Sequence, residues 1–189
     1  MSTRVRPTAC RSIAIEEYWR ETDYLRTVRN IRNRCRNFTV AIDYTGAEEW
    51  VIRHWSQQWN CDGDPVAQAD RVEIARELQR HGRHVTISLF DNGKMIGGSS
   101  NFIHQSDLVA GVYYYEPEYR RFGAGVRLID LAFALATERG LAGFDLGGKA
   151  DYKKKWAPVS GTRSSVLVAP RSLIIGIGQL VRLAAPWVG

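Results

Sequence analysis

A run of three tyrosines leads into a turn of arginines and glycines, and this segment has the residue types most suited to chemistry. Residues 113–125 read Tyr-Tyr-Tyr-Glu-Pro-Glu-Tyr-Arg-Arg-Phe-Gly-Ala-Gly. A predicted helix follows at once, without Ser, Thr, Asp or Asn to accept its first N–H groups. Glycine lets a ligand approach the backbone, and the helix dipole favours an anion there. The segment therefore predicts a phosphate or pyrophosphate site, with Arg120 and Arg121 adding positive charge.

An ordinary strand-to-helix loop is the alternative interpretation of this turn, because a Gly-x-Gly pattern alone is weak evidence. The spacing excludes a P-loop, which requires Gly-x-x-x-x-Gly-Lys-Ser/Thr. It also excludes the Rossmann pattern Gly-x-Gly-x-x-Gly, because Gly125 is followed by Val-Arg-Leu. What supports a ligand site is the context, in which a strand precedes the turn and a helix follows it.

The elements that must position this turn form a mixed α/β pattern. In chain order, we predict helix 14–35, strand 37–44, helix 47–59, helix 68–81, strands 85–90, 95–103 and 108–116, helix 126–139, strand 141–146, helix 151–156 and strand 165–169. Asn92-Gly93 between two apolar runs predicts a hairpin, because both residues accept positive φ. Helix 126–139 is apolar on most of its circumference, so we expect it to be buried.

Length and composition indicate one globular domain. The chain has 189 residues, of which 44% are hydrophobic and 24% charged, and this excludes a disordered chain or a multi-domain machine. Three widely spaced cysteines argue against a disulfide framework, and the four scattered histidines have no metal-ligand spacing. We therefore expect no metal. No apolar signal stretch follows the first residues, so we expect a cytoplasmic protein.

Positive charge is concentrated in the first 36 residues, which hold nine Arg against four acids, or +5 of the total +6. We divide the chain into a basic helical arm (1–36), a central domain (37–170) and an apolar tail (171–189). The arm suits an anionic partner such as nucleic acid, or it is a solvated helix face. The tail suits docking on a core edge or a partner, including a second copy of the chain. Polar and proline interruptions disfavour a membrane role.

Residues 120–125, Arg-Arg-Phe-Gly-Ala-Gly, resemble the Arg/Gln-x-x-Gly-x-Gly/Ala signature of the GNAT acyltransferase superfamily. The order of predicted elements over about residues 40–170 is similar as well. Residues 140–156, Gly-Leu-Ala-Gly-Phe-Asp-Leu-Gly-Gly-Lys-Ala-Asp-Tyr-Lys-Lys-Lys-Trp, resemble the GNAT-like domain of cellulose-biosynthesis-type proteins. That branch is related to the peptidoglycan-bridge aminoacyl transferases. The resemblance implies an α/β (α+β) fold whose mixed, mostly antiparallel sheet is flanked by helices.

The resemblance also implies that the turn holds the pyrophosphate of an acyl-coenzyme A, most simply acetyl-CoA. The N–H groups of residues 122–125 would contact the pyrophosphate, and the strand before the turn would hold the thioester. The residues assigned to the coenzyme in this way are Tyr115, Arg120, Arg121, Phe122, Gly123, Ala124, Gly125 and Lys153. The Lys153–Lys155 run can instead be a solvated face. The acceptor would lie beside Tyr113, and aromatic walls there suit a small organic or amino-acid-like amine.

Proton transfer needs an acid and a base. The resemblance places Tyr152 where a tyrosine protonates the departing thiolate, although Tyr152 can instead pack against Trp156. For the base we expect a carboxylate acting through water, Glu116 first and Asp145 second, and either can instead be a solvated or ion-paired acid. His104, near the end of its strand, is a further candidate at the acceptor site, or a hydrogen-bonded bystander.

Three functions follow from these observations. The first is an N-acyltransferase that uses acyl-CoA and transfers the group directly to an amine. The second is an aminoacyl transferase that uses charged tRNA, which the basic arm favours and the intact pyrophosphate signature disfavours. The third is a non-catalytic GNAT-like module in a biosynthetic complex, with the arm and tail as its contact surfaces.

Overall fold

The structure is a computed structural model that describes residues 6–14, 22–58, 65–148 and 161–165. Its elements are β1 (Arg6–Ala14), α2 (Thr22–Arg34), β2 (Thr39–Ile42), α3 (Ala47–Gln58), α4 (Pro65–Arg80), β3 (His84–Asp91), β4 (Lys94–His104), β5 (Asp107–Tyr115), the 3₁₀ helix η1 (Pro117–Phe122), α5 (Ala124–Glu138), β6 (Gly143–Gly148) and β7 (Gly161–Ser165). From β2 to β6 this order follows the sequence prediction.

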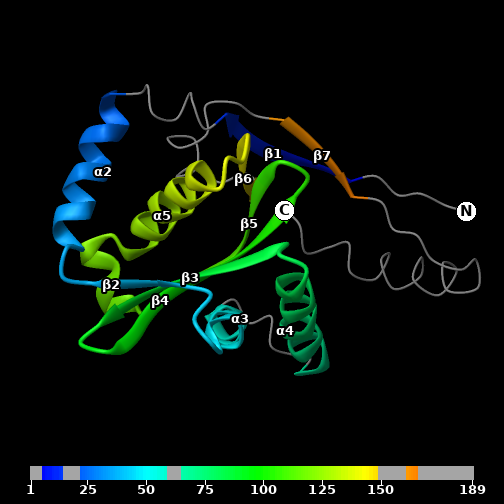
Figure 1. Ribbon diagram of the computed structural model, residues 1–189, viewed down its shortest axis with the longest axis horizontal. Coiled ribbons are helices and arrows are strands. Elements are labelled where there is room, and N and C mark those ends of the chain that lie inside the picture. Colours follow the sequence, from blue (N-terminus) through cyan, green and yellow to red (C-terminus); the bar gives the residue numbers. More distant parts are fainter. Residues whose placement is uncertain (1–5, 15–21, 59–64, 149–160, 166–189) are drawn as a thin grey trace, which may run out of the picture.

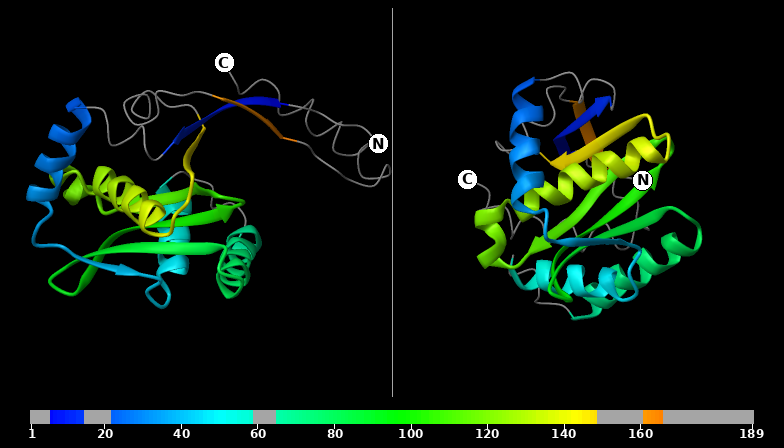
Figure 2. Two further views of the ribbon diagram at one scale, coloured as in Figure 1. Left: turned by 45° about the horizontal axis from the view of Figure 1, so that its top comes forward. Right: turned by 60° about the vertical axis from the view of Figure 1, so that its left-hand side comes forward.

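One sheet organises the molecule, with the strand order β2-β3-β4-β5-β6-β1-β7. All neighbouring strands are antiparallel except β5 and β6, which are parallel and are connected through α5. Helices α2 and α5 cover one face of the sheet, and α3 and α4 cover the other (Figures 1 and 2). The predicted mixed, mostly antiparallel sheet flanked by helices is therefore confirmed.

The main core lies between the sheet and α5. Alternate residues of β3, Val85, Ile87 and Leu89, are fully buried in it, as the period of two in a strand requires. From α5, Phe133 packs edge to face on Phe144 of β6, with ring centroids 4.5 Å apart. The predicted burial of this helix is confirmed, and its packing fixes where α5 begins.

A β-bulge in β5 decides which of its side chains face α5. Ser100 pairs with Val112 and Asn101 pairs with Ala110, so Gly111 between them has no partner on β4. A side chain at Gly111 is excluded, since a Cβ there would lie 2.3 Å from the Ser100 carbonyl oxygen. The extra residue shifts the alternation by one. As a result the odd-numbered tyrosines that follow, Tyr113 and Tyr115, pack into the α5 core.

Helix α2 is joined to α5 by a buried carboxylate. Asp130 of α5 is 1% exposed and accepts two hydrogen bonds from Arg32 of α2, Nε–Oδ2 at 2.9 Å and Nη2–Oδ1 at 2.6 Å. Arg127, one turn earlier on α5, donates to the same carboxylate. This paired, hydrogen-bonded charge holds the basic helix against the domain.

Polar side chains are buried on the opposite face, beneath α3 and α4. His84 is 2% exposed, and its Nε2 lies 2.7 Å from Ser100 Oγ. Burial lowers the pKa of His84 below its ordinary value, against the opposing effect of the nearby carboxylates of Asp43 and Glu48. Glu48 is itself paired with Arg76 at 2.9 Å. Burial therefore favours the neutral form of the His84 imidazole within the fold.

The two ends of the chain differ from the sequence prediction. The predicted helix 14–35 starts too early, because Ala14 belongs to β1 and the helix begins at Thr22. Strand β1 lies between β6 and β7, so pairing rather than local pattern makes it extended. The last described strand is β7, which overlaps the predicted strand 165–169 at Ser165, and residues 166–169 lie outside the described residues. Helix 151–156 and the apolar tail lie outside the described residues, and the three-part division of the chain remains a prediction.

No helix among the described residues is both long and apolar enough to cross a bilayer.

Replacing Asp130 by Asn should lower the free energy of unfolding by about 3 kcal/mol, because a buried, doubly paired carboxylate is removed from its arginines. Chemical denaturation measures the change. Glu138→Gln, an exposed acid on the same helix, is the matched control and should change stability by less than about 0.5 kcal/mol. Equal effects in the two variants would contradict the role given to Asp130.

The neutral state of His84 should make stability pH-dependent. Because its folded pKa lies below its unfolded value of about 6.5, the unfolded chain binds the extra proton as pH falls through that value. The free energy of unfolding should therefore decrease below about pH 6.5 with a slope of at most about 1.4 kcal/mol per pH unit. His84→Gln should reduce this slope. By NMR, the His84 imidazole should still be neutral at about pH 6.5, where an ordinary histidine is half protonated.

Candidate functional site

Strands β5 and β6 separate after a short parallel contact, and a cavity opens where they part. Only Asp107–Val109 pair with Gly143–Asp145. Beyond them lies a cavity of about 630 Å³, framed by α3, β5, η1, α5 and β6. Its lining residues are Trp55, Gln58, Ala110, Gly111, Tyr113, Tyr115, Arg120, Gly125, Val126, Ile129 and Leu146. The structure thus brings four of the predicted site residues, Tyr113, Tyr115, Arg120 and Gly125, into one wall.

The first turn of α5 presents open backbone donors at this wall. Gly123 is its N-cap, with φ 81° and ψ 33°, and no side chain among the described residues caps the helix. The first hydrogen bond within α5 runs from the Arg127 N–H to the Gly123 carbonyl at 2.9 Å, so the N–H groups of Ala124, Gly125 and Val126 have no acceptor within the helix. Ala124 is fully buried, whereas Gly125 and Val126 line the cavity. Such a turn binds anions.

Gly123 departs from the sequence prediction in one respect. Its N–H donates to the Arg120 carbonyl at 3.0 Å, closing η1. It is therefore not available to a ligand, and Phe122 lies within η1. The donors at the cavity are therefore the N–H groups of Gly125 and Val126 rather than those of residues 122–125, because a 3₁₀ turn rather than an extended loop precedes the helix.

Tyr115 packs directly on Gly125. A Cβ at Gly125 would lie 2.6 Å from Tyr115 Cε1, closer than a side chain tolerates. Glycine is therefore required at this position for the packing of the Tyr115 ring. The tyrosine ring and the helix start form one continuous wall of the cavity.

Tyr113 is held by buried polar groups of β4. Its hydroxyl donates to Asn101 Oδ1 at 2.8 Å, and Asn101 Nδ2 donates to Ser99 Oγ at 2.9 Å. Asn101 and Ser99 are both fully buried. This network fixes the Tyr113 ring in the cavity wall.

Glu116 stands at the end of β5, outside the cavity lining. Its Oε2 lies 3.4 Å from the Tyr114 hydroxyl. Burial and this carboxylate both raise the pKa of Tyr114 above its usual value. Tyr114 packs against Trp50 and His54 of α3, so the Glu116–Tyr114 pair belongs to the α3 face of the sheet.

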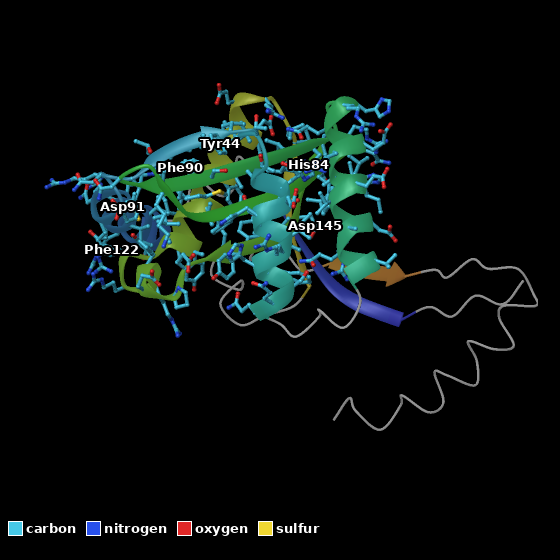
Figure 3. The ribbon with its side chains drawn as sticks, turned by 90° about the horizontal axis from the view of Figure 1, so that it is seen from below. Tyr44, His84, Phe90, Asp91, Phe122 and Asp145 are labelled. Atoms are coloured by element: carbon cyan, nitrogen blue, oxygen red, sulfur yellow. The ribbon has the colours of Figure 1, made fainter. Side chains whose placement is uncertain are left out.

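Asp145 lies on β6 between two residues that face α5, Phe144 and Leu146. By strand alternation its side chain points to the other face, and Figure 3 shows it in the region of α3 and α4. Asp145 is 7% exposed, and its Oδ1 accepts the Gly147 N–H at 2.7 Å. The carboxylate thus closes a turn at the strand end.

His104 is not brought to the cavity. It is exposed and pairs with Asp107 at the start of β5, whereas the lining begins at Ala110. The tight β4–β5 turn places it at the far end of the strand from the site. Arg121 lies over the Phe122 ring, 4.8 Å from its centroid, outside the cavity. Tyr152 and Lys153 lie outside the described residues.

Several lining residues were not found from the sequence. Trp55 and Gln58 come from the end of α3, and Leu146 comes from β6. Trp55 also stacks under Arg71, whose Cζ is 5.6 Å from the ring centroid. The spacing of Trp55, Gln58 and Leu146 in the sequence does not indicate a shared site, since only tertiary packing brings them together. Gly111 did carry a signal, because a lone glycine in a strand often marks a bulge.

Comparisons with known proteins agree with this arrangement. The family model described as an acetyltransferase (GNAT) domain matches residues 20–154. The C-terminal DUF2156 domain of an Agrobacterium fabrum protein assigned as a lysylphosphatidylglycerol synthetase superposes with TM-score 0.62 at 12% identity, over 96% of this chain and 66% of that chain. L-PGS from Bacillus licheniformis superposes with a TM-score of 0.60 at 14% sequence identity, over 96% of this chain and 67% of that chain.

A predicted acetyltransferase from Clostridium acetobutylicum, solved with acetyl-CoA, gives TM-score 0.51 at 13% identity, over 63% of this chain and 88% of that one. At such identities the likeness concerns the fold. This chain spans about two thirds of the length of the two synthetase chains. A sequence search of curated proteins found no match.

The contact between Tyr115 and Gly125 predicts a non-additive pair of substitutions. Gly125→Ala should lower the free energy of unfolding by about 1–3 kcal/mol, because the added methyl group overpacks against the ring. In a Tyr115→Ala background the same substitution should cost much less, giving a coupling of at least about 0.5 kcal/mol. Denaturation of the four proteins of the cycle measures it, and additive effects would contradict the contact.

Proposed function

The chain belongs to the GNAT acetyltransferase-domain family, and from this premise we propose that it is an N-acyltransferase using an acyl-coenzyme A, acetyl-CoA in the first instance. The acyl group would pass directly to an amine. The observation that carries the proposal is the open first turn of α5 beside the cavity where β5 and β6 part.

The donor would bind along α5 and β5. The N–H groups of Gly125 and Val126 would bind the pyrophosphate, together with Arg120, the only charged side chain among the described lining residues. From Ala110 to Tyr115, the edge of β5 that β6 has left would run beside the pantetheine arm and the thioester.

In the reaction, the amine nitrogen attacks the thioester carbonyl carbon. A C–N bond forms, the C–S bond breaks, and coenzyme A leaves as the thiolate. One proton leaves the nitrogen and one is taken up by the sulfur. Tyr152 remains the proposed acid. For the base, Glu116 and Asp145 are the proposed carboxylates, acting through water because neither lines the cavity.

The acceptor would lie between Trp55 and the tyrosines of β5. The described lining there is aromatic and apolar, with Gln58 as the polar group, and holds no carboxylate to pair with a second positive charge. These features support a small aromatic or amino-acid-like amine over a polycation.

The proposal predicts thioester binding and amine-dependent release of coenzyme A thiol. Calorimetry with acetyl-CoA should give micromolar binding, and Gly125→Glu should abolish it, because the new side chain would displace the Tyr115 ring and place a carboxylate at the anion position. Ile74→Glu, an exposed site on α4, is the matched control and should bind normally. In a thiol-release assay across amines, aromatic amines and amino acids should exceed polyamines.

Two outcomes would reject the proposal. Binding of bulk tRNA that falls steeply with salt, without thioester binding, would favour the tRNA-dependent transferase, which the basic face of α2 supports. Binding of neither would favour a non-catalytic module.

A further inference from the structure

Helices α3 and α4 lie side by side on one face of the sheet (Figure 1), and a groove of about 460 Å³ lies between them. Small-molecule sites in proteins commonly have volumes of about 300–1,000 Å³. The described lining residues of the groove are Glu49, Arg53, Gln68, Ala69, Val72, Glu73, Arg76 and Arg80. They do not overlap with the described lining residues of the cavity beside α5, so the groove is a separate feature.

Paired charges hold the two helices together at the start of α3. Arg76 of α4 donates to Glu48 Oε1 and to Glu49 Oε2 of α3, and both distances are 2.9 Å. Arg80, one turn further along α4, pairs with Glu77 of the same helix. The charges of these two arginines are therefore already compensated by the protein.

The two helices run in opposite directions along the groove. Arg76, near the end of α4, meets Glu48 at the start of α3. One turn further along α3, Ile52 belongs to one buried cluster with Val72 and Ala75, which lie earlier on α4. Residues three or four positions apart on each helix therefore follow one another along the same wall of the groove.

Beyond the paired charges, the groove carries two opposite charges that are not paired. Arg53 lies one turn after Glu49 on α3. Glu73 lies one turn before Arg76 on α4, so it faces Arg53 from the opposite wall. Among the described residues, neither Arg53 nor Glu73 forms an ion pair, either with the other or with a third side chain. The groove thus presents a free guanidinium opposite a free carboxylate.

We propose that this groove binds a free α-amino acid with an apolar side chain. The carboxylate of the amino acid would pair with the Arg53 guanidinium, whose planar fork suits two parallel hydrogen bonds. The ammonium group would pair with the Glu73 carboxylate. The apolar side chain would lie on Ala69 and Val72, the two apolar residues of the described lining. A ligand that carries only one of the two charges would leave the other side chain unpaired. This site lies outside the proposed acyltransferase cavity and does not depend on the proposed function.

Calorimetric titration with L-leucine tests the site without any acyl donor. Leucine should bind the wild-type protein with a dissociation constant of about 1 mM or less. Leucinamide lacks the carboxylate, and N-acetylleucine lacks the ammonium group. Each should bind at least about tenfold more weakly than leucine, because each loses a charged hydrogen-bonded pair.

Substitutions of the two unpaired side chains locate the binding. Arg53→Gln and Glu73→Gln should each weaken leucine binding at least about tenfold. Asp70→Asn on α4 and Arg26→Gln on α2 remove exposed charges outside the groove, and these matched controls should bind leucine normally.

A second measurement separates the groove from the cavity. In NMR spectra of the wild-type protein, leucine should shift the side-chain amide signals of Gln68 and leave the signals of Tyr113 unchanged. Saturating leucine should also leave acetyl-CoA binding unchanged.

Other results overturn the inference. If leucine does not bind the wild-type protein, Arg53 and Glu73 are only solvated charges. If leucine binds but both groove variants bind it normally and the signals of Tyr113 shift, the amino acid occupies the cavity as an acceptor. Equal weakening in the control variants indicates a general effect of net charge. Failure of acetyl-CoA to bind would reject the proposed function and leave the groove in place.

Discussion

The separation of β5 from β6 is the constraint on which the site depends. Two parallel strands joined by a buried helix would ordinarily pair along their length, but here they share three register pairs. The α5 core holds the far end of the pair together through Phe133 and Phe144. Past that point β5 follows β4, so one edge of β5 is left beside the cavity. An opening made by strand divergence leaves backbone donors and acceptors exposed to a ligand.

The bulge at Gly111 gives this opening its lining. Without the extra residue, Val112 and Tyr114 would face α5, and Tyr113 and Tyr115 would face α3. The single unpaired glycine thus places Tyr113 and Tyr115, rather than Tyr114, on the face of the sheet that packs against α5. It also separates two polar systems, since Asn101 holds Tyr113 on one face while Glu116 contacts Tyr114 on the other. Because Glu116 lies on the other face from the cavity groups, a proton can pass between them only through water at the strand edge and not through a direct hydrogen bond.

How far the sequence predicts the structure depends on whether the signal is local. The Asn92-Gly93 turn, the buried helix α5 and its uncapped start are encoded within a few residues, and all three are present. The partners that complete the site are not encoded locally. Trp55 reaches it from α3 and Leu146 from β6. Strand β1 escaped prediction because its neighbours β6 and β7 lie far along the chain, and its own pattern is weak.

Charged side chains are paired along α5 but unpaired at the turn before it, among the described residues. Asp130 neutralises Arg32 and Arg127 where the helix is buried, and a carboxylate there serves to dock α2 without leaving a charge unpaired. At the turn the opposite holds, because Arg34, Arg36 and Arg121 face solvent with no carboxylate partner among the described residues. Docking through a compensated pair, together with the Cys35 contact to the Phe122 carbonyl, holds the backbone at the end of α2 beside the turn. An anion bound at the start of α5 would then lie near positive charge carried on an ordered backbone.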